Sequence, residues 1–337
     1  MKIKLWGTRG SLPTPLTAAQ VRDKVVQALS AARGQDLPAD EGALAEWVDE
    51  HLPFSARATC GGNTACVQVG TETADFVLLD AGTGLRDFAF DYRRQYMRGS
   101  HPSFPVGTHF HVFLSHLHWD HLQGLPFFYP LYAAGQQVTF YGAHERIEEA
   151  VRLQFSTPYF PVAYEYLKAR IHYQRLSVGE SHDIAGMRVR LCEQNHPGVS
   201  YGYRCERGGK VFVYSTDCEH KQADTASPHY PLLEFYADAD LLVFDAMYSL
   251  EEAIFDKADW GHSSSVIGVE LAARARVKRL ALFHHDPHHT DAELTETLFN
   301  TRMYAELYHQ EMNRKHPHSG KFPSEVLLAY DGLEVVL

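Results

Sequence analysis

The sequence predicts an α/β protein in which two mixed β-sheets pack face to face and helices cover both outer faces, a four-layer αββα sandwich. Segments with the alternation or the apolar run of β-strands recur along the chain, and segments with helical spacing fall between them. The chain has 337 residues, 45% of them hydrophobic, which is enough to bury a sizeable core. Each sheet and each amphipathic helix has an apolar face that must be buried. Two sheets packed on each other, with helices on their outer faces, bury all of these faces.

Three strands and a helical insertion are expected in the first part of the chain. Residues 2–7 (KIKLWG) and 64–70 (TACVQVG) alternate like strands, and 75–84 (DFVLLDAGTG) is a buried strand that ends in an aspartate and a glycine-rich turn. Residues 16–52 show helical spacing in two pieces separated by RGQDLPAD. We therefore predict a helical insertion at about 16–52, whose simplest role is a solvated cover without chemistry.

Strands and helices alternate through the rest of the chain. The expected strands are 109–114, 137–141, 187–195, 201–208, 210–217, 240–247, 279–285 and a last pair at 325–332 and 333–337. The expected helices are 144–154, 263–276 and 291–312. Since no repeat, low-complexity tract or linker divides the sequence, we predict a single domain over residues 1–337.

Composition narrows the function. A net charge of −11 and a pI near 6.0 argue against an extended nucleic-acid surface but leave a small anionic substrate open. No apolar stretch has the length of a signal peptide or a membrane span, so we expect a cytoplasmic protein without a membrane partner. The cysteines are odd in number and lack the close paired spacing of a zinc ribbon or redox motif, which favours reduced thiols.

The segment LSHLHWDHLQG, residues 114–124, has the composition of a metal site. Imidazoles and carboxylates are the ligands of hydrolytic zinc sites, and a loop after a strand can turn alternate side chains toward one point. His116 and His118 are two residues apart and share a face of an extended loop. Asp120 and His121 follow where the chain turns, so they can address a second metal beside the first.

The same segment resembles a known signature. SHLHWDH is similar to the His-x-His-x-Asp-His motif of the metallo-β-lactamase superfamily, and the resemblance extends through nearly the whole chain. LLDAGTG resembles the superfamily's strand-ending Asp-x-Gly turn. The resemblance implies that NHPGVSYGYR supplies His196, VYSTDCEH supplies Asp217 and RLALFHHDP supplies His284, with His285 as the alternative to His284.

The resemblance implies two divalent metal ions and a ligand set. The first metal would be held by His116, His118 and His196, the second by Asp120, His121 and His284, and Asp217 would bridge them. Bound cations lower the pKa of a shared water to roughly 7, which makes hydroxide available at neutral pH. The N/O ligands favour zinc first, with manganese or iron as alternatives.

Further motifs resemble the ribonuclease Z and phosphoribosyl cyclic phosphodiesterase branch. FDAMYS matches its acidic strand-end motif through Asp245, and DWGHSSS matches its histidine at a helix start through His262. The order of WGTRGSLPTP, CGGNTACVQV, LLDAGTGLR and AYDGLEV resembles the bacterial phosphoribosyl cyclic phosphodiesterase-like group. The basic arm of ribonuclease Z is missing, and HHDPHHTD departs from that enzyme's late motif, so a smaller substrate fits better.

We therefore expect a binuclear metal-dependent phosphodiesterase in which a metal-bridging hydroxide attacks a cyclic nucleotide, a cyclic sugar phosphate or a short nucleic-acid end. The expected catalytic residues are Asp120, His262 as general acid and Asp245 as its partner. The alternatives are a thioester or lactone hydrolase of the glyoxalase II type and a non-catalytic metal-bearing sensor module. The resemblance also suggests a homodimer.

Some residues keep two interpretations. Tyr159, Phe160 and Tyr164 could stack a nucleobase or could form a packed aromatic cover. Arg9 and Arg86 follow glycine-rich turns and could contact a phosphate, although structural salt bridges are the simpler expectation.

Overall fold

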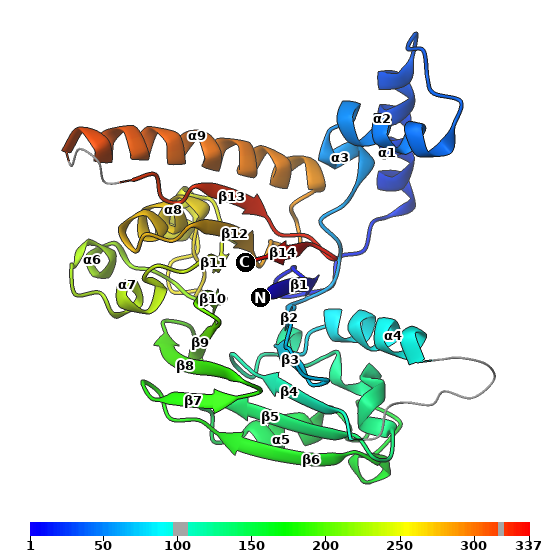
Figure 1. The fold of residues 1–337 in the computed structure, drawn as a ribbon, viewed down its shortest axis with the longest axis vertical. Coiled ribbons are helices and arrows are strands. Elements are labelled where there is room, and N and C mark those ends of the chain that lie inside the picture. Colours follow the sequence, from blue (N-terminus) through cyan, green and yellow to red (C-terminus); the bar gives the residue numbers. More distant parts are fainter. Residues whose placement is uncertain (97–106, 316–319) are drawn as a thin grey trace.

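The structure is a computed structural model and describes residues 1–96, 107–315 and 320–337 (Figure 1). The expected αββα sandwich is confirmed, because two seven-stranded mixed sheets pack together and helices cover their outer faces. Within the described residues, no helix combines the length and the apolarity that crossing a membrane requires.

The first sheet has the strand order β14-β1-β2-β3-β4-β5-β6. Its strands are β1 (Lys2–Gly7), β2 (Cys66–Val69), β3 (Phe76–Leu79), β4 (His109–Phe113), β5 (Gln137–Gly142), β6 (Arg170–Arg175) and β14 (Glu334–Val336). Strands β3 to β6 run parallel, while β14, β1, β2 and β3 pair antiparallel. The parallel half therefore brings the carboxyl ends of β3 and β4 to one edge.

The second sheet mirrors this arrangement with the order β13-β12-β11-β10-β9-β8-β7. Its strands are β7 (Ser181–Ile184), β8 (Met187–Gln194), β9 (Ser200–Arg207), β10 (Lys210–Ser215), β11 (Leu241–Asp245), β12 (Arg279–Phe283) and β13 (Glu325–Leu328). Strands β10 to β13 are parallel, so the carboxyl ends of β10, β11 and β12 also share an edge.

Helices complete the outer layers. The α-helices are α1 (Ala18–Ala32), α2 (Glu41–His51), α3 (Phe54–Arg57), α4 (Gly84–Tyr96), α5 (Ile147–Leu153), α6 (Gln222–Ala226), α7 (Pro231–Tyr236), α8 (Ser265–Arg274) and α9 (Asp291–Lys315). The short helical turns are η1 (Trp119–His121), η2 (Leu125–Phe127), η3 (Tyr129–Tyr132), η4 (Tyr164–Tyr166) and η5 (Glu252–Asp256). Helix α4 lies along the first sheet, and α8 and α9 lie over the second (Figure 1).

Three apolar layers hold the sandwich together. The central layer joins both sheets, with Phe113 and Phe283 among its buried side chains. Phe88 of α4 packs on the outer face of the first sheet, and Val269 of α8 packs on that of the second. Burial of such side chains contributes about 1.5–3 kcal/mol each. The two sheets are therefore held as one rigid platform beneath the loops at their shared edge.

Residues 16–52 form α1 and α2, which project from the sandwich (Figure 1). Neither helix contains a buried residue. Thr17 begins α1 with a capping box to Gln20, and Asp40 caps α2. The base of the projection is tied to the body, because Lys24 Nζ lies 2.7 Å from Oδ2 of the buried Asp291 at the start of α9.

Some elements differ from the expectation. Helix α4 was not expected, because it begins inside the glycine-rich turn that ends β3. Strand β6 was missed because its side chains are largely exposed, and β7 because it has only four residues. The two last strands do not pair with each other: β13 extends the second sheet beside β12, and β14 extends the first beside β1.

Candidate metal centre

The expected metal ligands come from loops at the carboxyl ends of strands in both sheets. His116 and His118 follow β4, and η1 carries Asp120 and His121. The others lie far along the chain: His196 lies between β8 and β9, Asp217 follows β10 and His284 follows β12. Because these strand ends meet at the shared edge, ligands from distant segments gather there.

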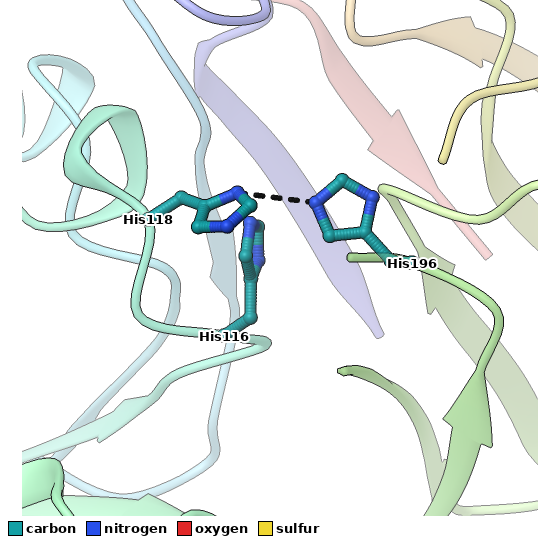
Figure 2. Close-up of side chains that lie close together, drawn as sticks. All are labelled: His116, His118 and His196. Atoms are coloured by element: carbon teal, nitrogen blue, oxygen red, sulfur yellow. Dashed lines mark hydrogen bonds between the residues drawn. The ribbon is translucent and has the colours of Figure 1, made fainter. Parts of the chain in front are cut away.

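His116, His118 and His196 form the first group (Figure 2). One ligand atom from each lies within 4.8 Å of the others. Nδ1 of His118 and Nε2 of His196 face each other at 3.1 Å. Figure 2 shows the three rings converging from the loop after β4 and from the loop before β9. A single cation can therefore contact all three imidazoles.

Asp120, His121 and His284 form the second group, again with ligand atoms within 4.8 Å of one another. Asp217 lies between the groups. Its Oδ1 is 3.7 Å from Nε2 of His116 and 3.3 Å from Nε2 of His284, and its Oδ2 is 3.3 Å from Nε2 of His121. One carboxylate thus faces both groups, as a bridging ligand must.

Protonation in the site suits cation binding. Burial alone would raise the pKa of Asp217, but the surrounding His284, His121 and His116 hold that pKa well below its usual value. Burial, followed by the charge of His121, lowers the pKa of His116 well below its usual value. An ionised carboxylate beside a neutral imidazole is the state that coordinates a metal.

His121 differs from its neighbours. Burial opposes its charged form, but Asp120, Asp217 and Asp80 raise the pKa of His121 well above its usual value. Three carboxylates around one buried ring require a compensating positive charge. A cation at this position would supply that charge.

Unpaired buried nitrogens provide an independent test of the fit. Among the described residues, Nε2 of His116 and both ring nitrogens of His284 make no hydrogen bond, although each side chain is only 1% exposed. Leaving such a buried polar atom unsatisfied costs about 1–3 kcal/mol. A metal ion would satisfy Nε2 of His116 and Nε2 of His284, which faces Asp120 and Asp217, so these residues fit the metal that the ligand pattern implies.

Asp80, which ends β3, orients two of these histidines. His121 donates through Nδ1 to Asp80 Oδ2 at 2.7 Å. Ser115 donates its hydroxyl to the same oxygen at 2.7 Å, so its Oγ accepts from Nδ1 of His116 at 3.0 Å. Both rings therefore direct Nδ1 at this oxygen pair and Nε2 at the site, where a bound cation would take the place of any Nε2 proton. Sequence analysis marked Asp80 only through its turn motif and did not identify Ser115.

Glu219 supports the third histidine indirectly. Nδ1 of His196 donates to the carbonyl of Gly261 at 2.9 Å. The backbone N–H groups of Gly261 and Asp259 in turn donate to the Glu219 carboxylate, each at 3.2 Å. A single buried carboxylate therefore holds the loop that orients His196. Sequence analysis did not find Glu219, whose role depends on contacts 40 or more residues away.

Backbone strain marks the same positions. Asp80, Asp217 and His284 have φ values of 60°, 54° and 60°, in the left-handed region that non-glycine residues seldom adopt. Such strain costs on the order of 1–3 kcal/mol per residue and collects at functional sites. Each of the three residues lies within two positions after a strand and turns its side chain into the site.

His262 and Asp245 lie beside the second group. Nδ1 of His262 is 2.8 Å from Oδ2 of the fully buried Asp245. The same carboxylate accepts from the backbone N–H groups of Cys218 and Met247. Burial opposes a charge on His262, but the Asp245 carboxylate and the hydrogen bond to it raise the pKa of His262 to about 9. The ring stacks on that of His284, with centroids 5.0 Å apart.

His284 rather than His285 faces the metal-ligand groups. His285 bonds instead to the carbonyl of Ala329 through Nε2, at 2.8 Å. Burial lowers the pKa of His285 to about 3. His285 is thus a neutral structural histidine that joins the loop after β12 to the segment after β13.

The arginine and aromatic residues with two possible roles also separate into structural residues and residues that line a cavity. Arg9 is buried and donates to the carbonyls of Gly61, Asp286 and His289, so its guanidinium joins three backbone segments rather than an acidic side chain. Tyr164 bonds to Tyr173, with their hydroxyls 2.9 Å apart. The remaining three, Arg86, Tyr159 and Phe160, line a cavity beside η1.

Comparisons with known proteins agree with this architecture. Residues 76–285 match the family model described as the beta-lactamase superfamily domain. Ribonuclease Z of Haloarcula marismortui is 25% identical over 323 residues, which cover 81% of this chain and 90% of that protein. Ribonuclease BN of Escherichia coli O81 is 25% identical over 285 residues, covering 68% of this chain and 89% of that protein.

Two solved structures share the fold. The metallo-beta-lactamase fold protein YhfI from Bacillus subtilis superposes with a TM-score of 0.60 at 16% identity, over 99% of this chain and 98% of that one. A diphosphatase from the PhnP family gives a TM-score of 0.56 at 19% identity, over 100% of this chain and 97% of that one. With the family model matching well over half of its residues, the chain belongs to the beta-lactamase superfamily and has the metallo-β-lactamase fold.

Proposed function

We propose that this protein is a binuclear metal-dependent phosphodiesterase that hydrolyses a small phosphodiester or nucleotide. The observation that carries the proposal is Asp217 between two ligand groups, with the His262–Asp245 pair beside them. The curated relatives named ribonuclease Z and ribonuclease BN, and the diphosphatase among the solved structures, support chemistry at phosphorus.

Seven residues would hold the metals. These are His116, His118 and His196 for one ion, Asp120, His121 and His284 for the other, and Asp217 for both. Two divalent ions, zinc first, would supply Lewis acidity toward the phosphate oxygens and an activated water at neutral pH. The hydrogen bonds of Nδ1 to Asp80 and Ser115 orient the Nε2 atoms of His121 and His116 toward this position.

The protein's own groups would then carry the proton. When the ester P–O bond breaks, the departing alkoxide needs a proton, and His262, whose ring is paired with the Asp245 carboxylate, lies at the edge of the site. Asp245 holds the ring in one orientation and keeps it protonated. Asp120 belongs to the second ligand group, and its Oδ2 accepts a hydrogen bond from the backbone N–H of Ser11 at 2.8 Å. This division of roles suits hydrolysis of an ester with a poor leaving group.

A substrate panel tests the proposal. Protein loaded with Zn²⁺ or Mn²⁺ should cleave bis-p-nitrophenyl phosphate and leave S-lactoylglutathione intact, and metal analysis should give close to two ions per chain. Asp120→Ala should lose mainly one ion. His288→Ala, which removes an exposed histidine outside the two groups, is the matched control and should keep both. Thioester cleavage would replace the proposal with a glyoxalase II-type function, and metal binding without turnover on any ester would replace it with a sensor role.

A further inference from the structure

A cavity of about 720 Å³ opens beside η1. Three segments line it: the start of α4, residues 119–127, and residues 153–160 after α5. Four aromatic side chains form much of its wall, namely Trp119, Phe127, Tyr159 and Phe160. Cavities that bind small molecules have volumes of about 300–1,000 Å³ and mostly apolar, aromatic walls with a few polar groups. In size and lining this cavity belongs to that class.

Three of the four aromatic rings are exposed rather than packed in the core, and only Phe160 packs against it. Trp119 is 60% exposed, Phe127 52% and Tyr159 77%. Phe160 supports the ring of Phe127 through an edge contact, with ring centroids 5.8 Å apart. Large exposed apolar groups that gather at one place mark interaction sites. The rings therefore offer flat faces to a ligand.

Polar groups at the cavity wall are held in place. Gln123 donates through Nε2 to Thr64 Oγ1 at 3.2 Å, and Thr64 donates to the backbone carbonyl of Asp120 at 2.7 Å. Arg86 is held by Asp87 and by Asn63. An amide oxygen and a guanidinium at the edge of a stacked ring can bond to the exocyclic groups of a base.

Trp119, which lines the cavity, lies between two of the candidate metal ligands in the sequence. Trp119 is bonded directly to His118 and Asp120, one from each ligand group, and neighbouring Cα atoms are about 3.8 Å apart. His118 and Trp119 are both exposed, whereas His116 and His196 are buried. The metal-ligand groups thus meet solvent at His118, next to the residue that lines the cavity.

We propose that this cavity binds the nucleobase of a nucleotide phosphodiester whose phosphate lies at the metal centre, an inference that rests on the proposed function. The base stacks on Trp119 and Tyr159, while Gln123 and Arg86 bond to its edge. Base stacking on aromatic side chains tolerates different bases, so the cavity selects nucleotides over other phosphodiesters more strongly than it selects one base.

Two esters with the same leaving group test this selection. Thymidine 5′-p-nitrophenyl phosphate and methyl p-nitrophenyl phosphate both release p-nitrophenolate and differ in the group that would enter the cavity. Tyr159→Ala and Phe127→Ala should each lower kcat/KM for the thymidine ester by about tenfold and the value for the methyl ester much less. Tyr166→Ala is the matched control, because Tyr166 is 72% exposed in the nearby η4 and does not line the cavity. Equal losses on both esters, or none on the thymidine ester, would overturn the inference.

A binding measurement separates this inference from the catalytic proposal. Metal-loaded protein is titrated with adenosine 5′-monophosphate or with ribose 5-phosphate, which lacks the base, and tryptophan fluorescence is followed. Adenosine 5′-monophosphate should quench the emission, ribose 5-phosphate should not, and Trp119→Phe should abolish the quenching. If wild-type protein cleaves neither ester while this difference persists, the proposed function fails and base binding stands. If ester cleavage is robust but the two ligands give the same response, base binding fails alone.

Discussion

Nδ1 of His262 lies 2.8 Å from Oδ2 of Asp245, and this contact joins the segment just before α8 to the end of β11. Burial disfavours a protonated imidazole. The buried carboxylate outweighs the cost of burial, since it raises the pKa of His262 to about 9. A proton is therefore held next to the metal-ligand groups at neutral pH.

The first prediction concerns this proton. His262→Ala should lower kcat by about 10²- to 10⁴-fold on an alkyl or ribose phosphodiester, because removing a general acid leaves the alkoxide without a proton donor. The loss should be small on a p-nitrophenyl ester, whose leaving group needs no proton. Rates on both substrates, measured together with metal content, check it. Equal losses on both, or loss of metal, would assign His262 to structure or to metal binding.

The second prediction concerns the bridging position. Asp217→Asn should keep the fold but hold fewer than two ions per chain, because an amide lacks the charge and the second anionic oxygen needed between two cations. Turnover should fall by several orders of magnitude. Metal analysis and circular dichroism on the same preparation check it, and near-normal metal content and turnover would show that Asp217 does not bridge.

The third prediction concerns Asp80, which touches the histidines but is not proposed as a ligand. Asp80→Asn should weaken metal affinity by about 10- to 100-fold, as expected when a carboxylate that orients ligand histidines is lost. Chelator competition measures the change. Asp238→Asn is a matched control, since Asp238 has a similar φ of 55° but lies on the surface and pairs with Arg276. Equal effects of the two substitutions would attribute the loss to backbone strain alone.

The fourth prediction concerns stability and pH. Burial raises the pKa of Asp331 to about 7, from an ordinary value of 3.8, despite hydrogen bonds from Thr8 and Asn63. A carboxyl group with a raised pKa in the folded state stabilises the protein fully below pH 4, and this contribution is lost as the pH rises through 7. The free energy of unfolding of Asp331→Asn should therefore rise relative to wild type between pH 5 and 8, by up to about 2.6 kcal/mol. Urea unfolding across this range checks it, and a difference that does not change with pH would contradict it.

The sequence predicted the ligands that lie close together in the chain, but spacing alone could not predict which distant residues join them. His116, His118, Asp120 and His121 stand close enough in the chain for their spacing to indicate a metal site. The remaining ligands were assigned by resemblance, because only the packing of the two sheets brings the ends of β4, β10 and β12 together.

The contacts that orient the candidate ligands could not be predicted from the spacing of residues in the sequence. Ser115 and Glu219 act through two hydrogen bonds each, whose partners depend on positions in the folded chain. Arg9 likewise follows a glycine-rich turn but faces backbone carbonyls, which no sequence pattern marks. Among the fold elements, β6 was missed because its exposed side chains lack the apolar alternation of a covered strand.

The separation of the last two strands bears on how the protein is made. β13 and β14 give each sheet an edge strand, and β14 pairs with β1, whose residues are synthesised well before those of β14. Neither sheet is complete until residues 325–336 have been synthesised. Because the polypeptide emerges at about 5–20 residues per second, the earlier strands remain without these partners for many seconds. The nascent chain therefore leaves the edges of β1 and β12 open until late in translation. Those edges are the places where a chaperone would act or where premature pairing with another chain would begin.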